Sequence, residues 1–124
     1  MGYESKIYIA EKGCFNNKNG KTYASIIAMF DMGKFYPLSD VLRYKPETNC
    51  YFYADDHNTE VLEDRYGRPL TETTIADVIR ILEKIVADEY DYRRIFPLFS
   101  TLQTIEKQQK DGLWGEIVVM HYGY

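Results

Sequence analysis

Residues 4–32 read ESKIYIAEKGCFNNKNGKTYASIIAMFDM, and this stretch sets the expected fold. From residue 4 to residue 11 polar and apolar side chains alternate, which is typical of a half-buried β-strand. Asn19 and Gly20 follow, and an Asn-Gly pair supplies the positive φ angles that hairpin turns require. Residues 23–32 are apolar on both faces, as expected of an interior strand that is covered on both sides. The stretch therefore predicts an antiparallel β-hairpin.

Two shorter strands are expected after this hairpin. Ser39 is expected to cap a short helical turn, which ends before Pro46. Residues 49–54 alternate again and predict a third strand. Residues 59–63 predict a short fourth strand, because polar turn residues lie on both sides of them.

Two helices are expected in the second half of the chain. The first begins after Thr73, and the pair Thr74 and Asp77 resembles a capping box with Asp in place of the usual Glu or Gln. The second covers residues 96–110, with Pro97 in the first turn, where its missing amide costs nothing. The apolar stripe of the first helix follows the spacing of three and four residues, and its members are Ile75, Val78, Ile79, Leu82, Ile85 and Val86.

The order of these elements predicts the fold class. Residues 114–122 form the expected last strand, which is apolar on both faces and should therefore lie between earlier strands. Strands come before helices in the chain, which favours an α+β fold over a doubly wound one. We expect an antiparallel sheet of about four to five strands with two helices packed on one face. Residues 1–124 are expected to form one domain.

Composition restricts the class of protein. The chain has 124 residues, a net charge of −4 and 45% hydrophobic residues, which is globular composition and predicts a soluble protein. The acidic balance argues against direct binding of a nucleic-acid strand. No apolar run approaches the roughly 18 residues of a membrane helix, and the first residues lack a secretory pattern. Two cysteines, Cys14 and Cys50, fit reduced thiols and a cytoplasmic location.

Candidate catalytic and metal-binding residues are few. The segment 55–64 holds five carboxylates, for which three interpretations are open: a solvated turn, a Ca²⁺ or Mg²⁺ site, or a surface that docks a basic partner. The spacing of a calcium loop is absent, so no metal is expected. His57 and His121 lack a nucleophile motif beside them, and no glycine-rich loop could hold a phosphate. No cofactor is therefore expected.

Tyrosine is the unusual residue type in this sequence. Twelve tyrosines are more than a small core can bury while satisfying each hydroxyl, so some should lie at the surface. Exposed tyrosine is enriched at protein interfaces because it offers a large contact area at low entropic cost. The expected partner-binding residues combine tyrosines with the acidic segment: Tyr51, Tyr53, Asp55, Asp56, Glu60, Tyr90, Tyr92, Tyr122 and Tyr124.

Four stretches resemble a group of small phage-encoded and mobile-element-encoded proteins of Gram-positive bacteria. The resemblance lies in residues 3–8, in residues 27–31, in residues 50–56 through Glu63 and Asp64, and in the closing residues 121–124. It implies a small accessory protein that binds host machinery, a class that includes anti-CRISPR-like inhibitors of defence nucleases. It implies no particular site residue.

These observations leave three functional hypotheses. The first is a non-enzymatic protein-binding module, such as an inhibitor of a host nucleic-acid enzyme. The second is a protein that binds or sequesters a nucleotide by stacking it on tyrosine rings. The third, ranked last, is an enzyme that uses His57 or His121. A homodimer is also expected, because a two-fold partner could cover an edge strand and exposed tyrosines.

Overall fold

The computed structural model describes residues 4–87, 93 and 95–124, which form one mixed β-sheet and three helices. The predicted α+β class is confirmed. Within these residues the elements follow in the order β1 (Ser5–Asn16), β2 (Thr22–Gly33), α1 (Tyr36–Leu42), β3 (Cys50–Tyr53), β4 (Glu60–Val61), β5 (Thr71–Thr73), α2 (Ile75–Ala87), α3 (Phe96–Lys110) and β6 (Ile117–Gly123).

The sheet has six strands in the order β4-β3-β2-β1-β6-β5. β1 and β2 form the expected antiparallel hairpin, and β6 lies between β1 and β5, so its predicted interior position is confirmed. The prediction of four to five strands, all antiparallel, is wrong in two respects. β5 is an additional strand, and β3 runs parallel to β2, with Cys50 beside Thr22.

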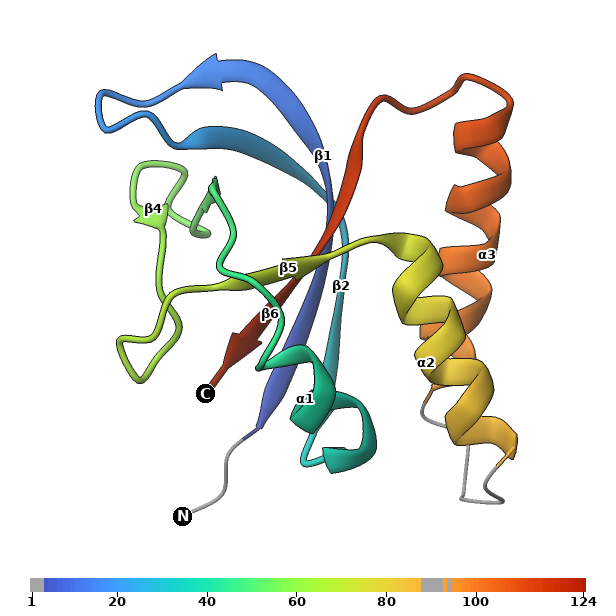
Figure 1. The fold of residues 1–124 in the computed structure, drawn as a ribbon. Helices are drawn as coiled ribbons and strands as arrows, with labels where there is room; N and C mark the ends of the chain where they lie inside the picture. Colours follow the sequence, from blue (N-terminus) through green and yellow to red (C-terminus); the bar gives the residue numbers. More distant parts are fainter. Residues whose placement is uncertain (1–3, 88–92, 94) are drawn as a thin grey trace.

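The parallel pairing has a physical cause in the path of the chain. β2 ends at Gly33, and α1 with the segment after it carries the chain back to the beginning of β2 (Figure 1). β3 then starts beside Thr22, whose amide donates to the carbonyl of Asn49 at 2.8 Å. Because β3 enters at the end where β2 also begins, the two strands must run in the same direction.

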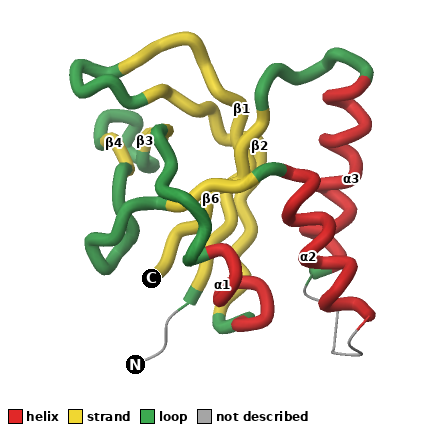
Figure 2. The backbone as a smooth tube through the Cα atoms, in the orientation of Figure 1, coloured by secondary structure: helices red, strands yellow, loops and turns green. Residues whose placement is uncertain are grey.

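Apolar side chains cover both faces of the sheet. α2 and α3 pack side by side on one face, while β3 and β4 lie on the opposite side (Figures 1 and 2). Alternate residues of β1 and β6 therefore enter two separate clusters. The helix-side cluster includes Ile7, Ile9 and Val119 together with Leu82 and Leu102, and the second cluster includes Ala10, Ala24, Phe52, Leu70, Val118 and Met120.

The ends of the helices follow local chemistry. The amide of Asp77 donates to the Oγ1 atom of Thr74 at 3.1 Å, which is the cap expected for α2. The expected cap at Ser39 is wrong, because α1 already begins at Tyr36, with Pro37 in its first turn, and Ser39 is buried within the helix. None of the described helices is long and apolar enough to cross a membrane.

Candidate functional site

A pocket of about 420 Å³ lies on the sheet face opposite α2 and α3. Its floor comes from the strands and its wall from the chain that follows β3. We call it the aromatic pocket and define it by its lining residues, which are Lys6 and Tyr8 of β1, Ile26 and Met29 of β2, Tyr122 of β6, and Phe52, Tyr53, Ala54, Asp55, His57 and Val61.

Three aromatic rings meet in the aromatic pocket for reasons of register. Lys6 of β1 lies opposite Tyr122 of β6, so Tyr8, two residues further along β1, is the diagonal neighbour of Tyr122 on the same face. The two rings are 6.2 Å apart in an edge-to-face arrangement. Phe52 of β3 completes the group, with its ring centroid 4.5 Å from that of Tyr8. Strand pairing therefore holds these rings in fixed positions.

The loop between β3 and β4 places two polar side chains at the aromatic pocket. Asp56 holds the loop, because its carboxylate accepts hydrogen bonds from the amides of Asn58 and Thr59 and from the Thr59 hydroxyl. The hydroxyl and amide bonds lower the pKa of Asp56 to about 2. His57 adopts a left-handed backbone conformation, with φ of 60°. Asp56 thus stabilises the loop, while its neighbours Asp55 and His57 line the pocket.

Lys6, Asp31 and the last residue, Tyr124, form a group of contacts beside the aromatic pocket. The ammonium of Lys6 lies 4.9 Å from the ring centroid of Tyr124. The Tyr124 hydroxyl donates to the carboxylate of Asp31 at 2.6 Å, and this bond raises the pKa of Tyr124 to about 12. Lys6 is also the cross-strand neighbour of Asp31. Lys6 is therefore flanked by an aromatic ring and a carboxylate on its own strand face.

A second tyrosine cluster adjoins the aromatic pocket through Tyr53. The ring centroids of Tyr23, Tyr51 and Tyr53 lie 5.6 to 5.8 Å apart. Tyr51 is buried, with 4% of its surface exposed, whereas Tyr53 is 42% exposed. Tyr23 is intermediate in exposure, so Tyr53 is the most exposed member of this cluster.

The expected partner-binding residues occupy different places. Tyr53, Asp55 and Tyr122 line the aromatic pocket. Asp56 is engaged in its own loop, and Glu60 accepts a hydrogen bond from the Asn17 amide at 2.7 Å. The ring of Tyr51 packs edge to face against that of Tyr53, and Tyr124 donates a hydrogen bond to Asp31 beside Lys6. Tyr90 and Tyr92 lie outside the described residues.

Sequence reasoning missed Lys6, Tyr8 and Met29 as pocket residues. The alternation of residues 4–11 predicts a half-buried strand with Lys6 and Tyr8 on the face opposite Ile7 and Ile9, and it does not indicate that this face lines a pocket. One signal in the sequence could have identified this face. Tyr8 is an aromatic residue at a position of the alternating pattern where a polar residue is expected, and the last predicted strand also carries a tyrosine, Tyr122. The pairing that brings Tyr122 to Tyr8 could not be read from the sequence, because it depends on strand order.

Two further hollows in the described part of the chain have a different lining. One, of about 320 Å³, lies between β2 and α3, and the other, of about 570 Å³, lies between α1 and α2. The lining of the first includes Ile27 and Trp114, and that of the second includes Tyr36 together with the charged Asp40 and Lys84. The aromatic pocket differs from both because four aromatic rings line it, whereas each of the other two has one.

A serine and a histidine form a close pair elsewhere in the sheet. Ser5 Oγ and His121 Nε2 are 2.8 Å apart, and the two residues are only 1% and 5% exposed. Burial lowers the pKa of His121 to about 4, so the imidazole is neutral near pH 7. A substrate cannot reach Ser5 in this arrangement, which is a buried hydrogen bond between β1 and β6.

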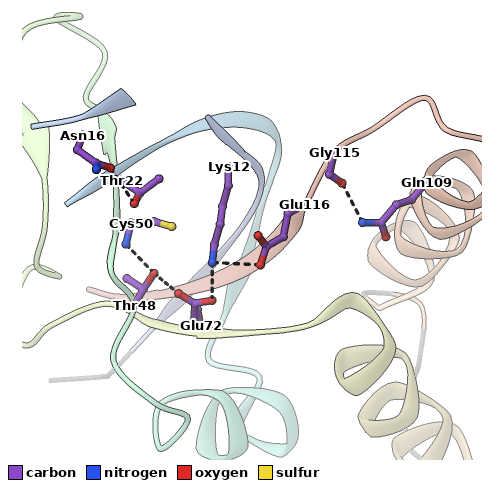
Figure 3. Close-up of polar contacts among 9 residues, drawn as sticks. All are labelled: Lys12, Asn16, Thr22, Thr48, Cys50, Glu72, Gln109, Gly115 and Glu116. Atoms are coloured by element: carbon purple, nitrogen blue, oxygen red, sulfur yellow. Dashed lines mark hydrogen bonds and ion pairs between the residues drawn. The ribbon is translucent and has the colours of Figure 1, made fainter. Parts of the chain in front are cut away.

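Cys50 is also withdrawn from solvent and belongs to a polar network at the beginning of β3 (Figure 3). Its amide donates to the Thr48 hydroxyl, which donates in turn to Glu72 at 2.7 Å. Lys12 pairs with Glu72 at 3.8 Å and with Glu116 at 3.3 Å. Burial raises the pKa of the Cys50 thiol, which disfavours the nucleophilic thiolate. The network joins β1, β3 and β5 with Glu116, the residue just before β6.

The acidic segment 55–64 does not converge on one point. Asp56 binds its own loop, Glu60 binds Asn17, and Asp64 accepts hydrogen bonds from the amides of Tyr66 and Arg68. In residues 4–87, 93 and 95–124, no three side chains of the types His, Cys, Asp and Glu gather as a metal ion would require.

Comparisons with known proteins give no relative of this chain. No protein-family model matches it, and no curated sequence or solved structure shows significant similarity.

Proposed function

We propose that this protein is a non-enzymatic binding module that recognises a partner protein through the aromatic pocket. One observation carries the proposal: a pocket of about 420 Å³ collects aromatic side chains from β1, β3 and β6 and places Asp55 and His57 beside them. Concave sites that combine apolar and aromatic walls with a few polar groups are the usual form of a recognition site.

The aromatic pocket is suited to holding a side chain of a partner. Its strand residues are fixed by pairing, and Asp56 fixes its loop, so little conformational entropy is lost when a partner binds. Tyr53 and Met29 are 42% and 46% exposed at its edge. Tyrosine and methionine are enriched at protein interfaces, and anchors buried in pockets supply most of the binding energy there.

The proposed partner is a host protein in the cytoplasm, such as a nucleic-acid enzyme inhibited by an accessory protein of phage or mobile-element origin. The net charge of −4 supports a partner with a basic surface, because charge complementarity speeds encounter and excludes acidic proteins. Nucleic-acid enzymes carry such surfaces to bind phosphates. Direct binding of nucleic acid by this acidic chain is disfavoured for the same reason.

An interaction experiment with matched variants tests this function. The immobilised protein would be exposed to a lysate of a Gram-positive bacterium, and captured proteins would be identified by mass spectrometry and then measured in purified form. We expect Tyr53→Ala and Tyr122→Ala to abolish capture of a protein that the wild type retains. Tyr44→Ala is the control, because Tyr44 is 76% exposed and outside the aromatic pocket. A partner lost equally with Tyr44→Ala, or retained by both pocket variants, would contradict the proposal.

Binding of a nucleotide is the second candidate, and the edge-to-face pair of Tyr8 and Tyr122 favours it. Aromatic faces stack bases, and the volume of the aromatic pocket lies within the range of small-molecule sites. A ligand that binds only the folded state raises its stability by mass action. A thermal-shift series with nucleoside mono-, di- and triphosphates would show a rise in Tm that is lost with Tyr122→Ala. No rise with any nucleotide would exclude this candidate.

A further inference from the structure

The charges around the aromatic pocket are unequal. Asp55 lines the pocket, and Asp31 lies beside it on the same strand face as Lys6. Lys6 is the one ammonium among the lining residues, and it is directed to the ring of Tyr124, whose hydroxyl binds Asp31. Among the lining residues Asp55 is the one carboxylate, beside Lys6 and His57, and Asp31 adds a second carboxylate next to the pocket. In the described part of the chain Asp55 is in no ion pair.

The pKa of the Tyr8 phenol is affected by burial and by these charges. This pKa is raised, first by burial and then by the nearby groups Tyr122, Asp55 and Asp31. Both carboxylates thus disfavour a further negative charge at the centre of the aromatic pocket. The faces of the tyrosine rings are themselves regions of negative potential, which attract cations.

We propose that the aromatic pocket receives an arginine side chain of the partner protein, with the guanidinium against the tyrosine rings and paired with Asp55. This inference rests on the proposed function and names the group that is recognised. A guanidinium is flat, is weakly hydrated and donates through a planar fork, so it can contact a ring with its face and a carboxylate with its edge. Tyr53, Tyr122 and Asp55 supply these two kinds of contact.

Other guests fit the aromatic pocket less well. A lysine ammonium is compact and strongly hydrated, and it would use the carboxylate without stacking on the rings. An anion would meet Asp55 and the ring faces. Lys6 opposes a cation, but it lies on β1 with its ammonium against Tyr124, whereas Asp55 belongs to the loop after β3. A guanidinium beside Asp55 would therefore lie against the loop after β3 and not against the strand that carries Lys6.

An NMR titration of the whole protein with small probes tests this inference. The probes are N-acetyl-arginine amide, the neutral isostere N-acetyl-citrulline amide, N-acetyl-lysine amide and inorganic phosphate. The observed signals are the Met29 methyl and the rings of Tyr8 and Tyr122. We expect saturable shifts with the arginine probe at millimolar concentration, weaker shifts with the lysine probe, and none with citrulline or phosphate.

A charge-matched pair of variants completes the test. Asp55→Asn should weaken binding of the arginine probe about tenfold, because a hydrogen bond to a charged group is lost. Glu83→Gln removes the same charge from an exposed position of α2 and should leave binding unchanged. Equal shifts with citrulline, binding of phosphate, no response to the arginine probe, or equal effects of the two variants would each overturn the arginine assignment.

The same variants distinguish failure of the arginine inference from failure of the proposed function. If a captured partner protein is lost with Tyr53→Ala but retained with Asp55→Asn, the aromatic pocket recognises a protein and the arginine assignment fails. If neither variant affects a captured partner, the pocket is not the recognition site, and both proposals fail.

Discussion

At the scale of single residues, burial decides what a polar side chain can do. The imidazole of His121 is 5% exposed and lies 2.8 Å from Ser5 Oγ, so the folded protein favours its neutral form. Loss of hydration is the largest cause of its lowered pKa, and Asp64 offsets part of this effect. His57, by contrast, is exposed at the rim of the aromatic pocket.

The titration of His121 predicts a specific dependence of stability on pH. Its pKa is about 4 in the folded state against 6.5 ordinarily, so between these values the unfolded chain binds a proton that the folded chain does not. The free energy of unfolding is therefore not reduced by His121 above pH 6.5. As the pH falls from 6.5 to 4, protonation of His121 in the unfolded chain lowers it by at most about 3 kcal/mol. Urea unfolding at several pH values should show this loss in wild type and in a His57→Gln control. In His121→Gln the free energy of unfolding should change less between pH 6.5 and pH 4. If its dependence on pH were the same as in the wild type, His121 would not be the titrating group.

The sequence predicted the roles of only some of the individual residues at the site. Composition alone indicated surface tyrosines, and Tyr53, Asp55 and Tyr122 do line one pocket. The pattern could not separate Tyr51 from Tyr53, because both lie on one face of a strand and only the curled packing of β3 buries the first. It also assigned Asp56 to a partner, whereas the turn geometry directs its carboxylate to the loop amides.

At the scale of elements, long periodic segments were predictable and short ones were not. The hairpin, α3 and the cap of α2 at Thr74 follow from periodicity and local chemistry. β5 has three residues of sequence TET, too short and too polar to show a period, and it exists because β6 provides a partner. The parallel direction of β3 depends on the return path of the chain through α1, which no local pattern encodes.

The pairing of β2 leaves part of an edge open. In the described part of the chain, β3 pairs with β2 only at Thr22 and Tyr23, so from Ala24 to Gly33 one side of β2 has no neighbouring strand. Met29, which is 46% exposed, lies in the middle of this segment. An open apolar edge can pair with the same edge of a second copy.

We expect this edge to support a homodimer at high protein concentration. Met29→Lys should shift the association toward monomer, because a lysine on an edge strand opposes pairing and two lysines would repel across the two-fold axis. Sedimentation velocity over a concentration series measures this change. The control is Leu113→Lys, the same kind of change at a side chain that is 66% exposed in the loop after α3. A wild type that stays monomeric, or a control with the same effect, would exclude the edge as a dimer interface.

At the scale of the whole molecule, the two apolar clusters depend on the same strands. In β6, Val119 enters the helix-side cluster while Val118 and Met120 enter the second cluster, and in β1 Ile9 and Ala10 divide in the same way. A strand that loses its pairing therefore removes side chains from both clusters together. Since the Lys12 network also joins three of the strands and the residue before β6, separate unfolding of either face is disfavoured.

This shared framework predicts one cooperative unfolding transition, which two aromatic signals can test independently. Trp114 packs against the helix-side cluster, whereas Tyr8 and Tyr122 pack against the second cluster. Leu82→Ala and Leu70→Ala each remove a buried side chain, one from each cluster, and should each lower the free energy of unfolding by about 2 to 5 kcal/mol. In both variants tryptophan fluorescence and near-UV tyrosine dichroism should give the same midpoint, as a two-state transition requires. A tyrosine transition that precedes the tryptophan transition in Leu70→Ala would show instead that the pocket side unfolds separately, and the aromatic pocket would then lack the rigid support on which its recognition role depends.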